Sequence, residues 1–348
     1  MHVTMRRLSL TIVATAVAFV VVAVLTARTA SAAAPEGFTL RGEFDARYAF
    51  GNLVSDPVAS WNLRLSGDLG WAILPGLNLT ARAHAAASFL DLQPELGVDR
   101  LFVQYEAGRT RLTMGRQAIN WGLATMFRPT DLITPRDPTT SDESRPGKVL
   151  ATLYWRTSPV TGVELVAGED VYAVRAGVAI GQTNMRVLGV SQPGARHALG
   201  VDFEGGLGGL YGEACYDWAD GAPEDYSTAG TLGWKKAFGS GKLVFAEYHR
   251  KDVRQGGIHL PFSFAAAGIT YPLDEFTTAS AALVADLRGG TKTATGTLSM
   301  LVADDLDLNF GVVVSVVPSG GPSPAGAGGA GGDTRLKGQA MVGLRWYL

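Results

Sequence analysis

The chain has 348 residues, with 30 basic and 32 acidic side chains, 44 glycines and a single cysteine, Cys215. The first 34 residues hold three arginines and no acid, so the remainder has 27 bases against 32 acids and a charge of −5. That balance excludes nucleic-acid binding through a general positive charge. One cysteine excludes an intramolecular disulfide. No histidine or cysteine has metal-site spacing, so we expect no metal and no cofactor.

Residues 1–34 have the layout of a secretory signal peptide. Two arginines form a basic start, an apolar run follows over 8–25, and small residues come close behind it. We expect cleavage after Ala32 or Ala34. The apolar run is long enough to span a membrane, so an uncleaved anchor is the alternative. No later run is long enough, and the rest of the chain has no predicted spanning helix.

The segment from Trp61 to Trp71 shows the pattern of the remaining chain. Its odd positions carry Trp, Leu or Gly, and its even positions carry Asn, Arg, Ser, Asp or Gly. Successive strand side chains point to opposite faces, so this strand has an apolar face and a polar face. Both tryptophans lie on the apolar face, about 25 Å apart along the membrane normal at a tilt of roughly 40°. That distance matches the apolar band of an outer-membrane barrel between its aromatic girdles.

Similar alternation recurs along the chain, in five segments before a long connection at 118–147 and thirteen after it. The predicted strands are 38–50, 61–71, 77–89, 100–105, 111–117, 148–157, 161–168, 171–181, 184–192, 195–205, 209–218, 227–238, 241–251, 262–271, 275–287, 291–303, 306–317 and 335–348. Short turns mixed with longer loops are typical of outer-membrane barrels. We therefore predict an all-β fold, a transmembrane antiparallel up-and-down β-barrel of about 18 strands, with 16 as the alternative. It forms a single domain over 35–348, with a flexible Gly-rich loop at 318–334.

Charged residues on well-alternating strands are expected to face the bore, because lipid tolerates polar side chains poorly. The predicted pore-lining bases are Arg41, Arg47, Arg64, Arg82, Arg100 and Arg345. The predicted pore-lining acids, on two strands across the barrel, are Asp202, Glu204, Glu213 and Asp217. A basic wall facing an acidic wall would favour dipolar or charged solutes. Alternatively, these residues pair and fill a polar interior.

The connection 118–147 interrupts the strand pattern. Prolines and aspartates cluster at 129–138, which excludes a regular strand there. Loops of this length are usually functional. The apolar residues of the loop are Trp121, Met126, Phe127, Leu132 and Ile133. Because these side chains are poorly suited to water, we expect the loop to fold back into the barrel and narrow it.

The loop also carries a resemblance. General porins place their constricting loop after the fifth strand, as this chain does. The motif Gly-Arg-Gln-x3-Trp-Gly from Gly115, followed by Pro-Thr-Asp and Pro-x-Asp, resembles a family of porin-like Gram-negative outer-membrane barrels with no settled substrate. The resemblance implies that six residues matter together, namely Arg116, Gln117, Trp121, Asp131, Asp137 and Arg145.

In physical terms, Arg116 or Arg145 would pair with Asp131 or Asp137 and fix the loop. A loop fixed only for stability is the alternative. Strict alternation places Arg116 on the outer face, so we expect a bulge at Gly115 or the membrane edge there.

These features predict a passive, porin-like channel for small polar or charged solutes in the outer membrane of a Gram-negative bacterium. Its partners would be outer-membrane lipid, the solutes and the barrel-assembly machinery, whose signal the C-terminal strand resembles. The pattern leaves the oligomeric state open. The alternative is a structural or partner-binding barrel of an export or electron-transfer complex. Glu247 and His249 share a strand face, so an outer-membrane hydrolase is a weaker alternative. The chain has no G-x-S-x-G motif, and we expect no enzyme.

Overall fold

The computed structural model describes residues 38–51, 58–88, 95–135, 147–206, 208–239, 241–303, 306–318 and 334–347. Side chains are described over 70–82 and, with the same gaps, over 97–316. The predicted signal peptide at 1–34 and most of the Gly-rich segment 318–334 lie outside the described residues. Within the described ranges, no helix is long and apolar enough to cross a membrane.

The described residues form 18 strands. The first nine are β1 (Phe38–Gly51), β2 (Val58–Leu74), β3 (Leu77–Ser88), β4 (Glu95–Ala107), β5 (Thr110–Gln117), β6 (Lys148–Arg156), β7 (Thr161–Gly168), β8 (Tyr172–Ile180) and β9 (Thr183–Gln192). The others are β10 (Arg196–Gly205), β11 (Leu210–Ala219), β12 (Ala222–Phe238), β13 (Lys242–Gln255), β14 (Ile258–Pro272), β15 (Thr277–Asp286), β16 (Lys292–Ala303), β17 (Leu306–Pro318) and β18 (Thr334–Tyr347).

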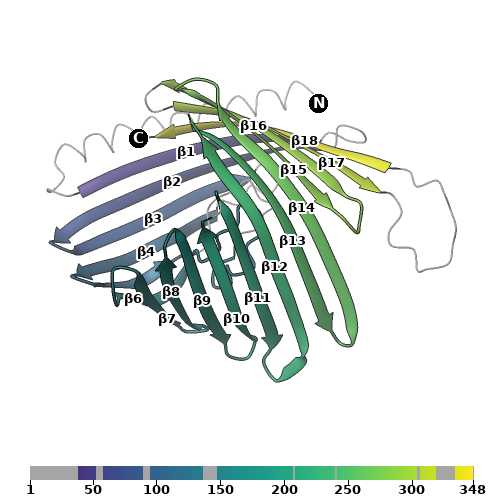
Figure 1. Cartoon of the computed structure of the whole chain (residues 1–348). Coiled ribbons are helices and arrows are strands. Elements are labelled where there is room, and N and C mark those ends of the chain that lie inside the picture. Colours follow the sequence, from purple (N-terminus) through teal and green to yellow (C-terminus); the bar gives the residue numbers. More distant parts are fainter. Residues whose placement is uncertain are drawn as a thin grey trace.

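The strands pair antiparallel in chain order, as they do for β1 with β2 and for β17 with β18. β1 also pairs with β18, with Phe44 opposite Trp346 and Tyr48 opposite Val342, so every strand has two neighbours. Figure 1 shows the strands side by side in this order, with β1 and β18 next to each other. The predicted all-β, antiparallel, up-and-down architecture is confirmed.

The two faces of the strands differ as the alternation predicts. Val187, Leu199 and Val201 on one face of β9 and β10 are more than half exposed, whereas Leu188 and Val190 on the other face are buried. A wide surface of exposed apolar side chains is typical of a barrel whose outer face meets hydrocarbon. The buried face therefore lines the interior of the ring.

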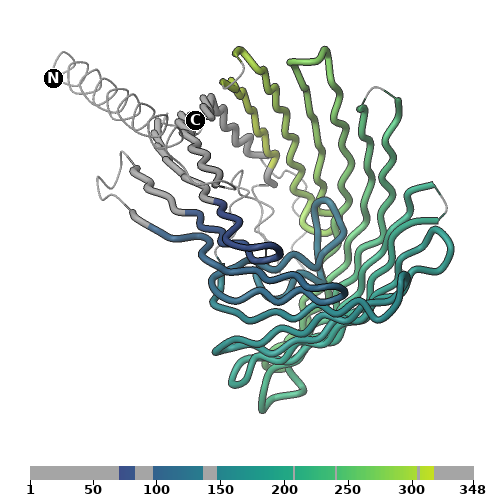
Figure 2. Tube along the Cα trace, turned by 90° about the vertical axis from the view of Figure 1, so that its left-hand side faces the viewer, coloured from purple at the N-terminus to yellow at the C-terminus, as the bar shows by residue number. Residues whose placement is uncertain are grey.

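Strand lengths differ around the ring. The strands β5 to β11 have 8 to 10 residues, whereas β12, β13 and β14 have 17, 14 and 15. The connections expected at 219–226 and 252–261 are largely strand, because alternation continues into short turns. Gly221, Gly256 and Gly257 have positive φ angles of 76°, 56° and 79°, which tight hairpin turns require. Figure 2 shows the teal and green strands of this region from the side.

Candidate functional site: the loop inside the barrel

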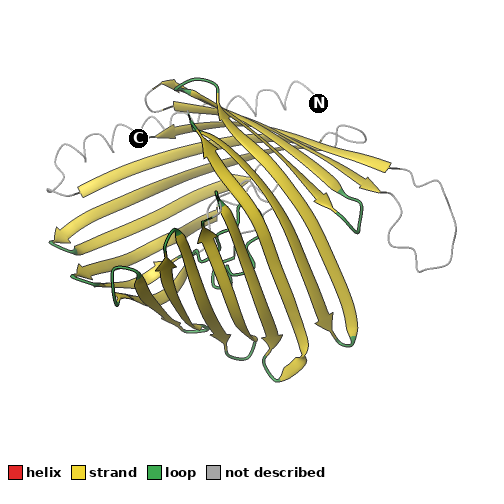
Figure 3. Cartoon of the chain, in the orientation of Figure 1, coloured by secondary structure: helices red, strands yellow, loops and turns green. Residues whose placement is uncertain are grey.

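Residues 118–135, which follow β5, form neither strand nor helix and lie against the inner faces of β7 to β14. In Figure 3 this green segment lies among the yellow strands. The contacts reach as far as β14, nine strands beyond β5 in the ring. The inward position predicted for the loop is therefore observed for 118–135.

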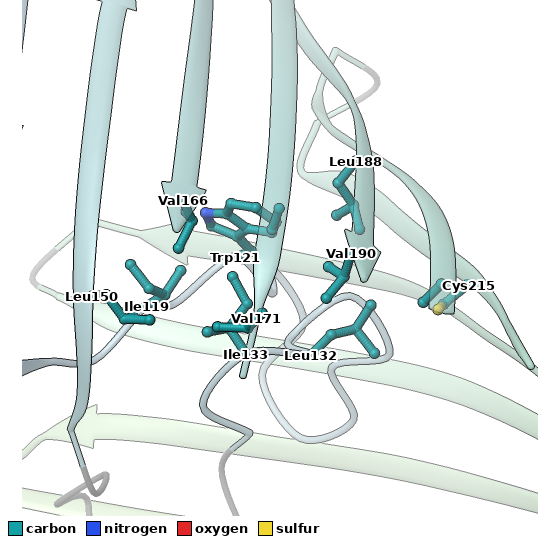
Figure 4. Packing of buried hydrophobic residues seen from close by; sticks show 12 residues of the cluster. Ile119, Trp121, Leu132, Ile133, Leu150, Val166, Val171, Leu188, Val190 and Cys215 are labelled. Atoms are coloured by element: carbon teal, nitrogen blue, oxygen red, sulfur yellow. The ribbon is translucent and has the colours of Figure 1, made fainter. Parts of the chain in front are cut away.

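An apolar cluster holds both ends of this segment on the wall. Ile119, Trp121, Leu132 and Ile133 of the loop are each less than 8% exposed. The wall contributes Leu150, Val166, Val171, Ala173, Leu188, Val190, Ala198 and Cys215. Figure 4 shows Trp121 beside Val166 and Ile119 beside Leu150. Because burying a large apolar side chain contributes about 1.5–3 kcal/mol, these contacts hold the loop firmly.

Trp121 also has a polar attachment. Its Nε1 donates to Oε2 of Glu164 on β7 at 3.0 Å. Arg175 of β8 donates to the same oxygen at 2.8 Å, and its guanidinium lies 5.1 Å from the Trp121 ring centroid. The indole is therefore fixed by a carboxylate at its edge and a cation at its face.

Glu213 of β11 binds the next part of the loop. Its Oε1 accepts the backbone N–H groups of Leu123 and Ala124, the latter at 2.5 Å. Its Oε2 accepts the backbone N–H of Thr130 at 3.2 Å and the hydroxyl of Thr130 at 2.5 Å. The Glu213 side chain is buried, and four hydrogen bonds replace the water that it has lost.

Glu247 of β13 has a similar role two strands further on. Its carboxylate accepts the backbone N–H groups of Thr125, Met126 and Phe127, with Met126 at 3.0 Å and Phe127 at 3.3 Å. Tyr211 donates its hydroxyl to the same carboxylate at 2.5 Å. Five consecutive loop N–H groups, from 123 to 127, thus point at two buried carboxylates. Such a run of N–H groups is an anion-binding arrangement, here filled by the wall of the protein itself.

Glu247 and His249, the predicted dyad, each bind other partners. His249 Nδ1 shares a 2.9 Å hydrogen bond with the Thr231 hydroxyl, which also donates to the carbonyl of Phe127. The Phe127 ring stacks on His249 at a centroid distance of 4.9 Å and on Phe264 at 5.3 Å. Both candidate catalytic side chains therefore contact the loop. Glu247 was not predicted as a loop anchor, because the only signal it gives in the sequence is a carboxylate on an inward strand face.

Of the loop residues that the resemblance singled out, Gln117 and Trp121 are buried on the inner side. Gln117 donates to the carbonyl of Leu150 at 3.1 Å. Arg116 instead shares the outer face with Met114, close to the end of β5, and donates to the carbonyl of Val98 at 3.0 Å. The pairing of β5 with both neighbours is continuous, so the bulge expected there is not found. Asp131 is buried in the loop, and Asp137 and Arg145 lie outside the described residues.

The predicted acidic wall faces inward, but bases of neighbouring strands accompany it. Asp202 accepts from Arg186 Nε at 2.5 Å, and Glu204 lies 2.6 Å from Lys235 Nζ. Asp217 accepts the Ser227 hydroxyl at 2.6 Å, and Glu213 is covered by the loop as described above. These contacts agree with the alternative in which lumenal charges pair, and they leave a smaller acidic surface than the strand pattern suggested.

The register of β1 to β4 places several predicted basic residues in one row. Arg41 is opposite Asp68, Asp68 is opposite Arg82, and Arg82 is opposite Arg100. A second row places Asp45 opposite both Arg64 and Arg345, and Arg47 is opposite Asn62 and Gly343. Bases outnumber acids in the first row, which fits a basic side of the interior.

The inner face of β14 to β17 is polar and nearly uncharged. Ser280 donates to Thr270 at 3.2 Å, Ser299 donates to Asn309 at 2.6 Å, and the Thr293 and Ser315 hydroxyls are 2.9 Å apart. The described residues contain no group of three or more His, Cys, Asp or Glu side chains that could hold a metal. This side of the ring offers small hydroxyl groups to a solute, and the described loop contacts it at β14, where Phe127 stacks on Phe264.

The ring of strands, its apolar outer face and the loop inside it define a membrane-spanning β-barrel. No protein-family model matches the chain, and no curated protein matches it either.

Among solved structures, the chain is similar to OccK5 (OpdH) of Pseudomonas aeruginosa, with a TM-score of 0.63, 10% identity and coverage of 90% of this chain and 99% of that one. It is similar to OccK2 (OpdF) of Pseudomonas aeruginosa in complex with glucuronate, with a TM-score of 0.62, 8% identity and coverage of 90% and 98%. It also resembles the trimer form of OmpT, an outer membrane protein of Vibrio cholerae, with a TM-score of 0.51, 12% identity and coverage of 89% and 99%. At these identities the likeness establishes the fold, which is that of an outer-membrane β-barrel.

Proposed function

We propose that the protein is a passive outer-membrane channel for small polar or charged solutes, narrowed by the loop after β5. A barrel of about 16–18 strands encloses an aqueous bore. The observation that carries the proposal is the inward attachment of 118–135 to Glu213 and Glu247, which holds the loop within the bore.

The interior of the barrel suits such solutes. Paired charges near the loop, a row of bases on β1 to β4 and small hydroxyl groups on β14 to β17 all bind water or polar solutes well. The similar barrel OccK2 was solved with glucuronate, a small polar anion, which supports the same class of solute here. The loop would then set the width of the bore and bring solutes close to the wall.

The test is ion conductance in planar bilayers, with the wild-type chain and with a variant that combines Glu213→Gln and Glu247→Gln. The two substitutions remove both carboxylates that accept the loop N–H groups, so the loop should leave the bore and the single-channel conductance should rise. Glu204→Gln is the control, because Glu204 pairs with Lys235 and does not hold the loop. Absence of current at any voltage would favour the structural or partner-binding barrel. An unchanged conductance would show that the loop does not limit the pore.

A further inference from the structure

The outer face of the barrel has a hollow that the channel does not use. The hollow has a volume of about 690 Å³ and lies over β9 to β13. Its floor consists of the small residues Ala214, Thr228 and Gly230, and a side chain added at Gly230 would meet only one backbone atom, at 3.7 Å. The exposed side chains of Leu199 and Tyr216 stand along one side. The hollow is therefore open toward the membrane and mostly apolar.

The strand register shows what borders the hollow on its other side. Across neighbouring strands, Ala214 is opposite Gly230, and Gly230 is opposite Arg250. Thr228 is opposite Asp252 in the next row. That row lies nearer the end of the barrel at which the loop after β5 begins. Arg250 and Asp252 thus project from the outer face of β13, where a barrel normally presents apolar residues. A charge on the lipid-facing side of a barrel is destabilising unless something compensates it.

These two residues belong to a larger charged group. Arg250 Nε lies 2.7 Å from Asp252, and His259 lies 3.4 Å from the same carboxylate. Arg254 is opposite His259 in the next row, and Arg288 is close enough to act electrostatically on Asp252. Within the described part of the chain, the exposed side chains of Arg254 and Arg288 make no hydrogen bond or ion pair. The outer-face group thus has three arginines and one aspartate, and the carboxylates of Asp225 and Asp286 in the adjoining turns accept backbone N–H groups instead.

We infer that this surface binds one membrane lipid with an anionic phosphate headgroup. An acyl chain would fill the hollow, whose volume falls in the usual range of ligand sites, about 300–1,000 Å³. Arg254 and Arg288 would bind the phosphate at the end of the hollow, where guanidinium groups make charge-assisted hydrogen bonds. The aromatic side chains of Trp218 and Tyr226, paired in the row of Arg254, mark that level as the membrane interface.

A second copy of the chain fits this surface less well. An interface with two-fold symmetry would bring the same basic group of both copies together, and like charges repel across a low-dielectric contact. It would also need a protruding side chain to enter the hollow. The lipid supplies both missing parts, an apolar chain and a negative charge. The inference rests on the lipid-facing outer wall of the fold and does not depend on the barrel conducting ions.

The test is native mass spectrometry of the full detergent-purified protein after adding dimyristoylphosphatidylglycerol, with dimyristoylphosphatidylcholine of the same chain length as the charge control. We expect one tightly retained phosphatidylglycerol. Gly230→Leu fills the hollow and should abolish retention, while Gly296→Leu, at another outer-face glycine with open space around it, should not. Arg254→Ser combined with Arg288→Ser should weaken retention roughly tenfold or more, from the loss of two basic groups at a membrane surface.

Three results would overturn the inference. One is equal retention by the wild type and Gly230→Leu, and another is equal retention of the two lipids. The third is an oligomer that dissociates in Gly230→Leu without any retained lipid, which would assign the hollow to a second copy. Each readout is independent of conductance, so failure of the lipid site and failure of the proposed channel are distinguishable.

Discussion

At the scale of single residues, two carboxylates determine where the loop lies. Glu247 is buried and accepts three backbone N–H groups of the partly buried loop and the hydroxyl of the buried Tyr211. In Glu247→Gln the amide loses the negative charge and turns an NH₂ group toward N–H donors. Each buried donor left without an acceptor costs about 1–3 kcal/mol, so we expect the loop to detach while the barrel remains folded.

Limited proteolysis within 118–135 measures this detachment, with the heat-modifiable electrophoretic mobility of the barrel as the check on folding. Glu204→Gln is a matched control, since it removes one inward carboxylate that binds Lys235 instead of the loop. Resistance of both variants to cleavage would mean that the apolar contacts of Trp121 and its neighbours suffice.

A second prediction at this scale concerns Arg82, which is opposite Arg100 on the inner side of β3 and β4. If solutes pass this row, Arg82→Ala removes one positive charge from the wall and should lower the permeability of anions relative to cations. The reversal potential in a salt gradient measures this ratio. Arg109→Ala, in the turn between β4 and β5, is the control and should leave the potential unchanged. If Arg82→Ala leaves the reversal potential unchanged, the conducting path does not pass this row.

At the scale of elements, β5 depends on one glycine. Gly115 has a φ of 127°, and a Cβ there would collide with the carbonyl oxygen of Leu101 on β4. We expect Gly115→Ala to destabilise the barrel next to the loop. Gly181→Ala is the matched control, since its φ is 60° but nothing lies within 4 Å. The temperature at which the folded electrophoretic band disappears should fall for Gly115→Ala by clearly more than for the control.

The strands themselves could be predicted from the sequence, because a two-residue alternation indicates how far each strand extends and which face each side chain is on. The alternation of β10 gave the correct faces, with Asp202 buried and Val201 exposed. Partners across strands could not be predicted, because they depend on register. For this reason Arg186 and Lys235 were missed as partners of the expected acidic wall, and Glu247 was missed as a loop anchor. The inward fold of the loop was predictable from its apolar residues, but the backbone N–H groups that fix it carry no signal in the side-chain pattern.

At the scale of the whole molecule, the wall has unequal height. At roughly 3.3 Å per residue and a tilt of about 40°, strands as short as those of β5 to β11 reach about 20–25 Å along the membrane normal, and strands as long as β12 to β14 reach about 35–43 Å. If the apolar band extends to the ends of the strands, a flat bilayer cannot match both heights. Either the lipid leaflets are pinched beside the low side, or the cylinder leans until its rim is level, and each response costs elastic energy that depends on bilayer thickness. The protein should therefore partition differently between thin and thick membranes, and its orientation relative to the bilayer should change with acyl-chain length.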